Sequence, residues 1–270
     1  MSHPIFLVHG IYPFDKALPF AFDEDNGPSD DRHYFRNIRS TLMAEGYTVF
    51  HVCVDWGGPL EKRADDLHKA IRRSTDDFTK YGKVHIVGHS MGGLDARAML
   101  CRHREMVDRV VSVATVGSPH HGSPFADWLV RRGDFGVALA KTMGLDLTGL
   151  RDLTREARRA FNTKNEAWEM KNKVAYRAWA GYQDYGRIFA PLKLSHPIIY
   201  EAEGKNDGLS SVASARWRTS VHAGTVDADH LNQIGWWDPD EWPDGDRRDA
   251  MEKRIKRLYV DIARAAVADE

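Results

Sequence analysis

The stretch that most constrains this chain is Lys83 to Arg97, which reads KVHIVGHSMGGLDAR. A short β-branched apolar run comes first and residues with helical spacing follow, so a strand, a sharp turn and a helix meet at Ser90. Gly88 and Gly92 flank that serine in the G-x-S-x-G pattern, in which a Cβ on either side would collide within the turn. The pattern therefore predicts a nucleophilic serine in a strained turn, with helix N–H groups directed at a developing oxyanion.

Length and charge limit the possible classes of protein. A chain of 270 residues can bury one large α/β core, and we predict a single domain over residues 1–270. The formal net charge is −1, from 38 Lys and Arg against 39 Asp and Glu, so no basic field favours nucleic acid as a partner. No apolar run approaches the roughly 18 residues that a transmembrane helix needs. Nothing in the sequence indicates an oligomeric state.

The chain begins MSHPIFLVHG and runs almost at once into an apolar strand. It lacks the charged region, long apolar region and cleavage site of a signal peptide. We therefore expect either a cytoplasmic protein or a leaderless or mature secreted one.

The two cysteines are poorly placed for a disulfide. Cys53 falls inside a predicted strand and Cys101 near the end of the helix after Ser90. A bond between them would require Cα atoms within about 7 Å. We expect both to be reduced core residues.

Strands and helices alternate along the chain, which predicts right-handed crossovers and a mostly parallel sheet with helices on both faces. The predicted strands are residues 4–8, 47–54, 84–87, 107–116, 197–203 and 217–221, and the predicted helices include 35–42, 60–71, the helix after Ser90 and 247–266. Ligands of such sheets bind beyond the carboxyl ends of the strands, where Ser90 would lie.

Residues 124 to about 195 interrupt this alternation. They contain many large apolar residues separated by glycines, at positions 133, 136, 144 and 149. Short amphipathic helices with glycine joints favour a mobile cap or lid over an apolar pocket. The alternative is a static helical excursion that completes the core.

An oxyanion loop is predicted just after the first strand, at His9-Gly10-Ile11. Gly10 permits a close approach to the serine. The backbone N–H groups of Ile11 and Met91 are the predicted oxyanion donors. His9 is expected to hold this loop in position rather than to take part in catalysis.

Ser90, Asp207 and His230 are the predicted catalytic triad. Serine is a poor nucleophile near neutral pH, so an imidazole must take its proton and return it to the leaving group. Asp207, in a turn after a late predicted strand, would fix the tautomer of His230. The weaker candidates are His120, His121 and His222 for the base, and Asp227 and Asp229 for the acid.

Six blocks between about residues 3 and 238 resemble, in order, those of the bacterial triacylglycerol lipases. The blocks are PIFLVHGIYPFD, KVHIVGHSMGGLDAR, VGSPHHGSPFADWL, LDLTGLRDLTREARRAFN, KNDGLSS and DADHLNQIGW. The resemblance implies an α/β-hydrolase fold with a helical lid. It also implies Ser90 as nucleophile, Asp207 as acid and His230 as base, with the Ile11 and Met91 amides as oxyanion donors.

The chain departs from that family where many members bind a structural calcium. The family's aspartate two residues after the catalytic histidine is Asn232 in this chain, and Gln233 stands closer to the histidine than the family's usual glutamine. Asp238 and Asp240 are the alternative ligands. The family's disulfide is not matched by the two cysteines. We therefore expect no cofactor, and assume neither calcium nor a foldase.

The expected activity is that of a lipase or carboxylesterase, a serine hydrolase that cleaves acyl esters through an acyl-enzyme on Ser90. Both simple esters and triacylglycerols remain open as substrates, and transient contact with a lipid interface is expected of a lidded enzyme. Phospholipase or polyester hydrolase activity would use the same machinery. The alternatives from other classes are an acyltransferase and a non-enzymatic binding protein.

Overall fold

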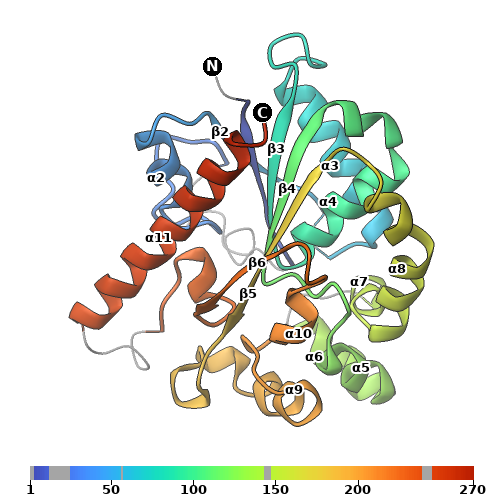
Figure 1. Ribbon diagram of the computed structural model, residues 1–270. Helices are drawn as coiled ribbons and strands as arrows, with labels where there is room; N and C mark the ends of the chain where they lie inside the picture. The colour runs from blue at the N-terminus through green and yellow to red at the C-terminus, as the bar shows by residue number, and fades with distance from the viewer. Residues whose placement is uncertain (1–2, 12–24, 56, 143–146, 239–244) are drawn as a thin grey trace.

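The computed structural model describes residues 3–11, 25–55, 57–142, 147–238 and 245–270. Its centre is a six-stranded sheet in the order β2-β1-β3-β4-β5-β6, in which all neighbouring strands run parallel (Figure 1). The strands are β1 (Ile5–Val8), β2 (Val49–Val52), β3 (Val84–His89), β4 (Val110–Val116), β5 (Ala175–Tyr182) and β6 (His222–Asp227). The predicted cap residues 143–146, residues 12–15 of the predicted oxyanion block and Asp240 lie outside the described ranges.

Helices cover both faces of this sheet (Figure 1). One face packs against α2 (Ile38–Ala44) and α11 (Gly245–Val267), the other against α3 (Leu60–Ser74), α4 (Met91–Arg102) and α8 (Arg155–Glu169). All six residues of β3 are buried, as expected for a strand covered on both sides. The prediction of a mostly parallel sheet flanked by helices is confirmed.

The remaining helices gather at one end of the sheet (Figure 1). They are α5 (Pro124–Arg131), α6 (Gly133–Thr142), α7 (Leu147–Asp152), α9 (Ser195–Glu203) and α10 (Val212–Ala215). The described residues also form the short 3₁₀ turns η2 (Arg104–Asp108), η3 (Tyr185–Arg187), η4 (Ala190–Leu192) and η5 (Asn232–Ile234). Phe125 and Leu129 of α5 pack with Leu150 of α7 and Ile199 of α9 in a separate apolar cluster.

Three of the predicted boundaries are wrong. The predicted strand 197–203 is helix α9, and the last strand is β6 rather than 217–221. Trp217 has φ 56°, which no strand allows. The sheet also resumes earlier than predicted, because β5 lies inside the predicted insertion of 124–195. The helical excursion therefore ends with α8.

The prediction that Cys53 is a core residue is also wrong. Strand β2 ends at Val52, and Cys53, the next residue, is exposed. Cys101 is half-buried, and neither cysteine is part of a disulfide.

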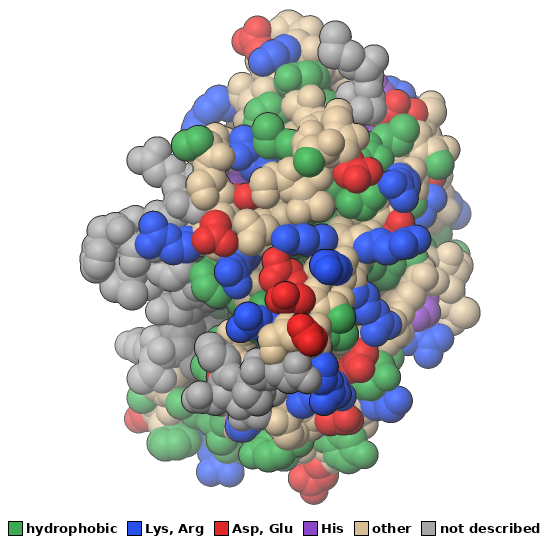
Figure 2. All heavy atoms as spheres, turned by 90° about the vertical axis from the view of Figure 1, so that its left-hand side faces the viewer, with side chains coloured by type: hydrophobic (Ala, Val, Ile, Leu, Met, Phe, Trp, Pro, Cys, Tyr) green, Lys and Arg blue, Asp and Glu red, His purple; other side chains and the backbone are tan. Residues whose placement is uncertain are grey.

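Basic and acidic side chains alternate on the face that carries α2 and α11 (Figure 2). Two ion pairs there are Lys256 with Glu252 at 2.7 Å and Arg264 with Glu45 at 3.2 Å. Within the described residues, no helix has both the length and the apolar character to cross a membrane.

Candidate active site

The turn at Ser90 joins the end of β3 to the start of α4. Ser90 has φ 57° and ψ −128°, a conformation that costs a non-glycine residue about 1–3 kcal/mol. A Cβ on Gly88 would lie 2.4 Å from the Gly93 nitrogen, and one on Gly92 would lie 2.2 Å from the Val8 carbonyl oxygen. Both glycines of the pattern are therefore required by backbone contact, and the strained turn predicted from the sequence is present.

The end of β1 passes directly against the serine. A Cβ on Gly10 would lie 2.6 Å from the Ser90 Cβ, so only glycine fits there. The Gly10 N–H donates to Tyr34 Oη at 3.0 Å, and Tyr34 Oη is 2.8 Å from His89 Nδ1. Ile11, the next residue, lines the cavity described below. This is the approach that an oxyanion loop requires.

A cavity of about 510 Å³ opens onto Ser90 and His230. Its wall is mostly apolar and comes from α5, α7 and the segments around residues 11, 191, 209 and 231. The apolar lining residues are Ile11, Pro119, Phe125, Ala126, Leu129, Leu150, Leu153, Phe189, Pro191, Leu192, Leu209, Leu231 and Trp236. Such a cavity suits an alkyl chain next to a nucleophile.

Asp207 is fully buried and holds His230 in a defined orientation. Its Oδ1 accepts from the backbone N–H groups of Leu209 and Ser210 at 2.9 and 2.7 Å. Its Oδ2 is 2.8 Å from His230 Nδ1 and accepts from Gln233 Nε2 at 2.8 Å. Because a carboxylate only accepts, His230 Nδ1 carries the proton and Nε2 keeps its lone pair. The geometry leaves Nε2 available as a base.

Ser90 and His230 face the same cavity, and no hydrogen bond joins these two described side chains. Catalytic contacts of this kind are often long in a free enzyme and shorten when substrate binds. The His89 ring centroid lies 4.5 Å from that of His230. Burial lowers the pKa of His89 well below its ordinary value, so His89 stays neutral and does not repel a His230 imidazolium.

Asp229, the nearest rival acid, has another role. Its Oδ1 accepts from the N–H groups of Leu231 and Asn232, and its Oδ2 from that of Phe189. Burial raises the pKa of Asp229 to about 7. Its oxygens thus shape the loop that carries His230 rather than contact the imidazole.

The other weaker candidates lie away from Ser90. Asp227 is on β6, 4.0 Å from Arg187. His120 stacks on Trp217, with ring centroids 4.7 Å apart, and His121 Nε2 is 2.7 Å from the Trp217 carbonyl oxygen. Neither these residues nor His222 are among the described residues that line the cavity.

The loop after His230 does not fit a calcium site of the family's type. Asn232 Nδ2 donates to the Trp236 carbonyl oxygen at 2.9 Å, which places an amide donor where the family has a carboxylate. Asp238 Oδ2 accepts from the Ala190 N–H at 3.0 Å. Hydrogen bonds within the chain thus hold this loop, and the role of Gln233 is to bond Asp207.

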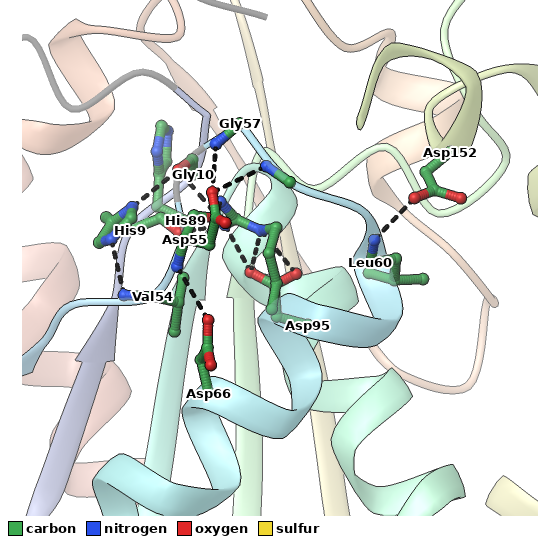
Figure 3. A network of polar contacts seen from close by, with 12 residues as sticks. His9, Gly10, Val54, Asp55, Gly57, Leu60, Asp66, His89, Asp95 and Asp152 are labelled. Atoms are coloured by element: carbon green, nitrogen blue, oxygen red, sulfur yellow. Dashed lines mark hydrogen bonds and ion pairs between the residues drawn. The ribbon is translucent and has the colours of Figure 1, made fainter. Parts of the chain in front are cut away.

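Arg63, which sequence reasoning missed, links the predicted oxyanion loop to α4. The side chains of Arg63 in α3 and Asp95 in α4 are both fully buried, with Nη2 and Oδ2 2.6 Å apart. Arg63 Nη2 also donates to the carbonyl oxygens of His9 and Gly10 at 3.1 and 3.3 Å. Figure 3 shows His9, Gly10 and Asp95 within this network.

His9 has the positioning role predicted for it. Its Nδ1 donates to the Gly10 carbonyl oxygen at 2.8 Å, and its Nε2 accepts from the Val54 N–H at 3.2 Å (Figure 3). The imidazole thereby ties the loop to the residues that follow β2.

Replacing Arg63 by methionine is expected to lower the free energy of unfolding by about 3–5 kcal/mol, because Asp95 would stay buried without a partner. It should also lower kcat by about 10²-fold, since the carbonyls that orient the oxyanion loop lose their donor. Urea unfolding measures the loss of stability. The kcat of the variant, measured under conditions in which it is still folded, checks the second effect.

Arg97→Met is the matched control for this prediction. Arg97 and Glu169 form a second fully buried pair, 2.7 Å apart, which does not contact His9 or Gly10. The Arg97→Met variant should lose a similar amount of stability but retain most of the parent's kcat. Equal kcat in the two variants would contradict the positioning role of Arg63.

Comparisons with known proteins agree with this architecture. Residues 50–132 match the family model described as a PGAP1-like alpha/beta domain. The chain is 28% identical to Triacylglycerol lipase 2 of Saccharomyces cerevisiae, covering 89% of this chain and 83% of that protein. It is 27% identical to a triacylglycerol lipase of Pseudomonas fragi, covering 86% and 87%.

Solved structures show the same fold. A Bacillus licheniformis lipase in its mature form superposes with a TM-score of 0.65 at 23% identity, covering 85% of each chain. A metagenomic carboxyl esterase superposes with a TM-score of 0.73 at 19% identity, covering 100% of this chain and 76% of that one. The protein is thus a homologue of the triacylglycerol lipases with the α/β-hydrolase fold of lipases and esterases, which confirms the resemblance seen in the sequence.

Proposed function

We propose that this protein is a carboxylic-ester hydrolase, a lipase or esterase, that works through an acyl-enzyme on Ser90. The observation that carries the proposal is the apolar cavity that opens onto Ser90 and His230, with His230 Nδ1 2.8 Å from the buried Asp207. Homology to proteins named triacylglycerol lipases supports the same reaction class.

In the proposed reaction, Ser90 Oγ attacks the ester carbonyl carbon while His230 Nε2 takes its proton. The carbonyl oxygen becomes an oxyanion, which the N–H groups of Ile11 and Met91 stabilise. Asp207 keeps His230 Nδ1 protonated and stabilises the imidazolium. His230 then donates its proton to the leaving alcohol, and the acyl group stays on Ser90.

Water completes the cycle. His230 Nε2 takes a proton from a water molecule, the resulting hydroxide equivalent attacks the acyl carbon, and the carboxylic acid leaves as Ser90 regains its proton. The apolar wall formed by Phe125, Leu129, Leu150 and Leu153 suits the alkyl chain of the acyl group. We propose an acyl ester of a fatty acid as substrate, reached by transient contact with a lipid surface.

Hydrolysis of p-nitrophenyl esters from acetate to palmitate tests this proposal. We expect the rate to rise with chain length to an optimum, as the cavity fills. An alkyl phosphonate should form one covalent adduct, on the peptide that contains Ser90. Ser123 and Ser210 also line the cavity, so an adduct on either would contradict the assignment.

An added alcohol separates the hydrolase from the acyltransferase. A hydrolase should still release mainly free acid at moderate alcohol concentration, whereas an acyltransferase would form mainly the new ester. Absence of both ester cleavage and the phosphonate adduct would overturn the proposed function.

A further inference from the structure

A second cluster of reactive side chains lies far from Ser90. His68 is in α3, His103 directly follows α4, and Glu105 is in η2. Because α4 begins next to Ser90 and rises 1.5 Å per residue over 12 residues, His103 lies about 18 Å further along it. The cluster therefore has no part in the reaction at Ser90.

The three side chains have the spacing of metal ligands. Glu105 Oε1 lies 3.7 Å from His68 Nε2 and 3.8 Å from His103 Nδ1, and the three ligand atoms lie within 4.8 Å of one another. Ligands about 2.0–2.1 Å from a tetrahedral Zn²⁺ stand about 3.4 Å apart. The distances between the three atoms are therefore close to those that a single ion requires.

The protonation of His103 suits a metal ligand. Its Nε2 is 2.8 Å from Asp65 Oδ1, and a carboxylate only accepts, so Nε2 carries the proton and Nδ1 has a lone pair. Arg102 donates to the same carboxylate at 3.0 Å and holds the pKa of Asp65 at about 2. This is the carboxylate–histidine arrangement that typically orients metal-binding imidazoles.

His68 lies beside His103 in this cluster. The His68 and His103 rings are stacked, with centroids 3.9 Å apart and planes 17° apart. The lone pair of an imidazole nitrogen lies in the plane of its ring, so one of the two rings turns out of the stack when both nitrogens bind one ion.

We propose that His68, His103 and Glu105 form a binding site for a divalent transition metal such as Zn²⁺. Two imidazole nitrogens and a carboxylate oxygen are a ligand set that Zn²⁺ accepts, and water would take the fourth position. His68 and Glu105 line a surface hollow together with Arg72 and Arg109. Arg72 is paired with Asp77 at 2.7 Å, and the Glu105 and Asp65 carboxylates offset the charge of the ion.

The bound ion would tie α3 to the end of α4 and to η2. Its effect is therefore on stability rather than on ester cleavage. Without a metal, the same residues are a partly exposed ion-pair cluster, which contributes little to stability.

Zinc titration of the full chain, free of any affinity tag and first stripped with a chelator, tests the proposal. Calorimetry should show one Zn²⁺ per chain, and Co²⁺ should give the visible bands of a tetrahedral site. At about a hundredfold excess of Zn²⁺ over Kd, the Tm should rise by about 5–10 °C.

Glu105→Gln and His68→Asn should weaken Zn²⁺ binding at least about tenfold and remove the Tm rise, and Asp65→Asn should weaken it about 10- to 100-fold. His222→Ala, on the edge strand β6, is the matched control and should bind as the parent does. Glu105 is 68% exposed, so Glu105→Gln should fold even if His68→Asn does not. Either no Zn²⁺ uptake by the parent, or equal uptake by the parent and Glu105→Gln, would overturn the proposal.

Discussion

Ser90→Gly is expected to abolish ester hydrolysis and yet to make the protein more stable. The loss of activity follows from the loss of the nucleophile, which costs about 10⁶-fold in kcat in a serine hydrolase. The gain in stability follows from φ 57° and ψ −128° at Ser90, a conformation that glycine adopts without strain. Relief of about 1–3 kcal/mol of strain exceeds the roughly 0.5–1 kcal/mol of extra chain entropy that glycine loses on folding.

Ser90→Ala is the control that separates the two effects. It removes Oγ but keeps a Cβ at positive φ, so it should lose as much activity and gain no stability from strain relief. Urea unfolding of the three proteins should place the glycine variant about 1 kcal/mol above the alanine variant. Residual hydrolysis in both variants near the parent rate would show that Ser90 is not the nucleophile. A glycine variant about 0.5–1 kcal/mol less stable than the alanine variant would show that the turn stores no strain.

The turn at Ser90 could be predicted from sequence because its requirements are local. Gly88 and Gly92 are needed by backbone atoms only a few residues away or on the neighbouring strand. The β-branched run of β3 and the helical spacing of α4 are likewise contained in a window of about 20 residues. The parallel sheet with helices on both faces followed from the alternation of strands and helices.

The late part of the fold could not be predicted with the same rules. PIIYEAE is a short apolar run that suits a strand or a helix, and α9 buries only part of it, including Ile199. AYRAWAGY forms β5 although its alanines and glycine favour no strand, because the segment pairs with β4 on one side and β6 on the other and buries Ala178 and Ala180 fully. Tertiary packing decided both elements.

The residues around the predicted triad come from distant segments. Tyr34 contacts Gly10, and Arg63 contacts the carbonyls of His9 and Gly10. Gln233 contacts Asp207. Neither spacing nor motif connects them with Ser90 in the sequence. The single-domain assignment and a mobile cap stay predictions, as do the roles of Ile11 and Met91.

Asp207→Asn is expected to lower kcat by about 10⁴-fold without unfolding the protein. Oδ1 of Asp207 accepts two backbone N–H groups, so the oxygen of an asparagine side chain would stay at that position. The amide nitrogen would then face His230 Nδ1, which would have to accept a hydrogen bond. The imidazole would carry its proton on Nε2, and it could no longer take the proton of Ser90.

Asp229→Asn tests whether the loss of activity is specific to the acid that bonds His230. The alternative is that removing any buried acid near His230 has the same effect. The amide nitrogen in Asp229→Asn would face the Phe189 N–H, so the variant should lose about 1–3 kcal/mol of stability. Because Asp207 would still hold His230, kcat of the folded fraction should stay within about tenfold of the parent. Steady-state kinetics on p-nitrophenyl butyrate, with thermal unfolding of each variant, measures both quantities. A 10⁴-fold loss in Asp229→Asn together with a small loss in Asp207→Asn would instead make Asp229 the partner of His230.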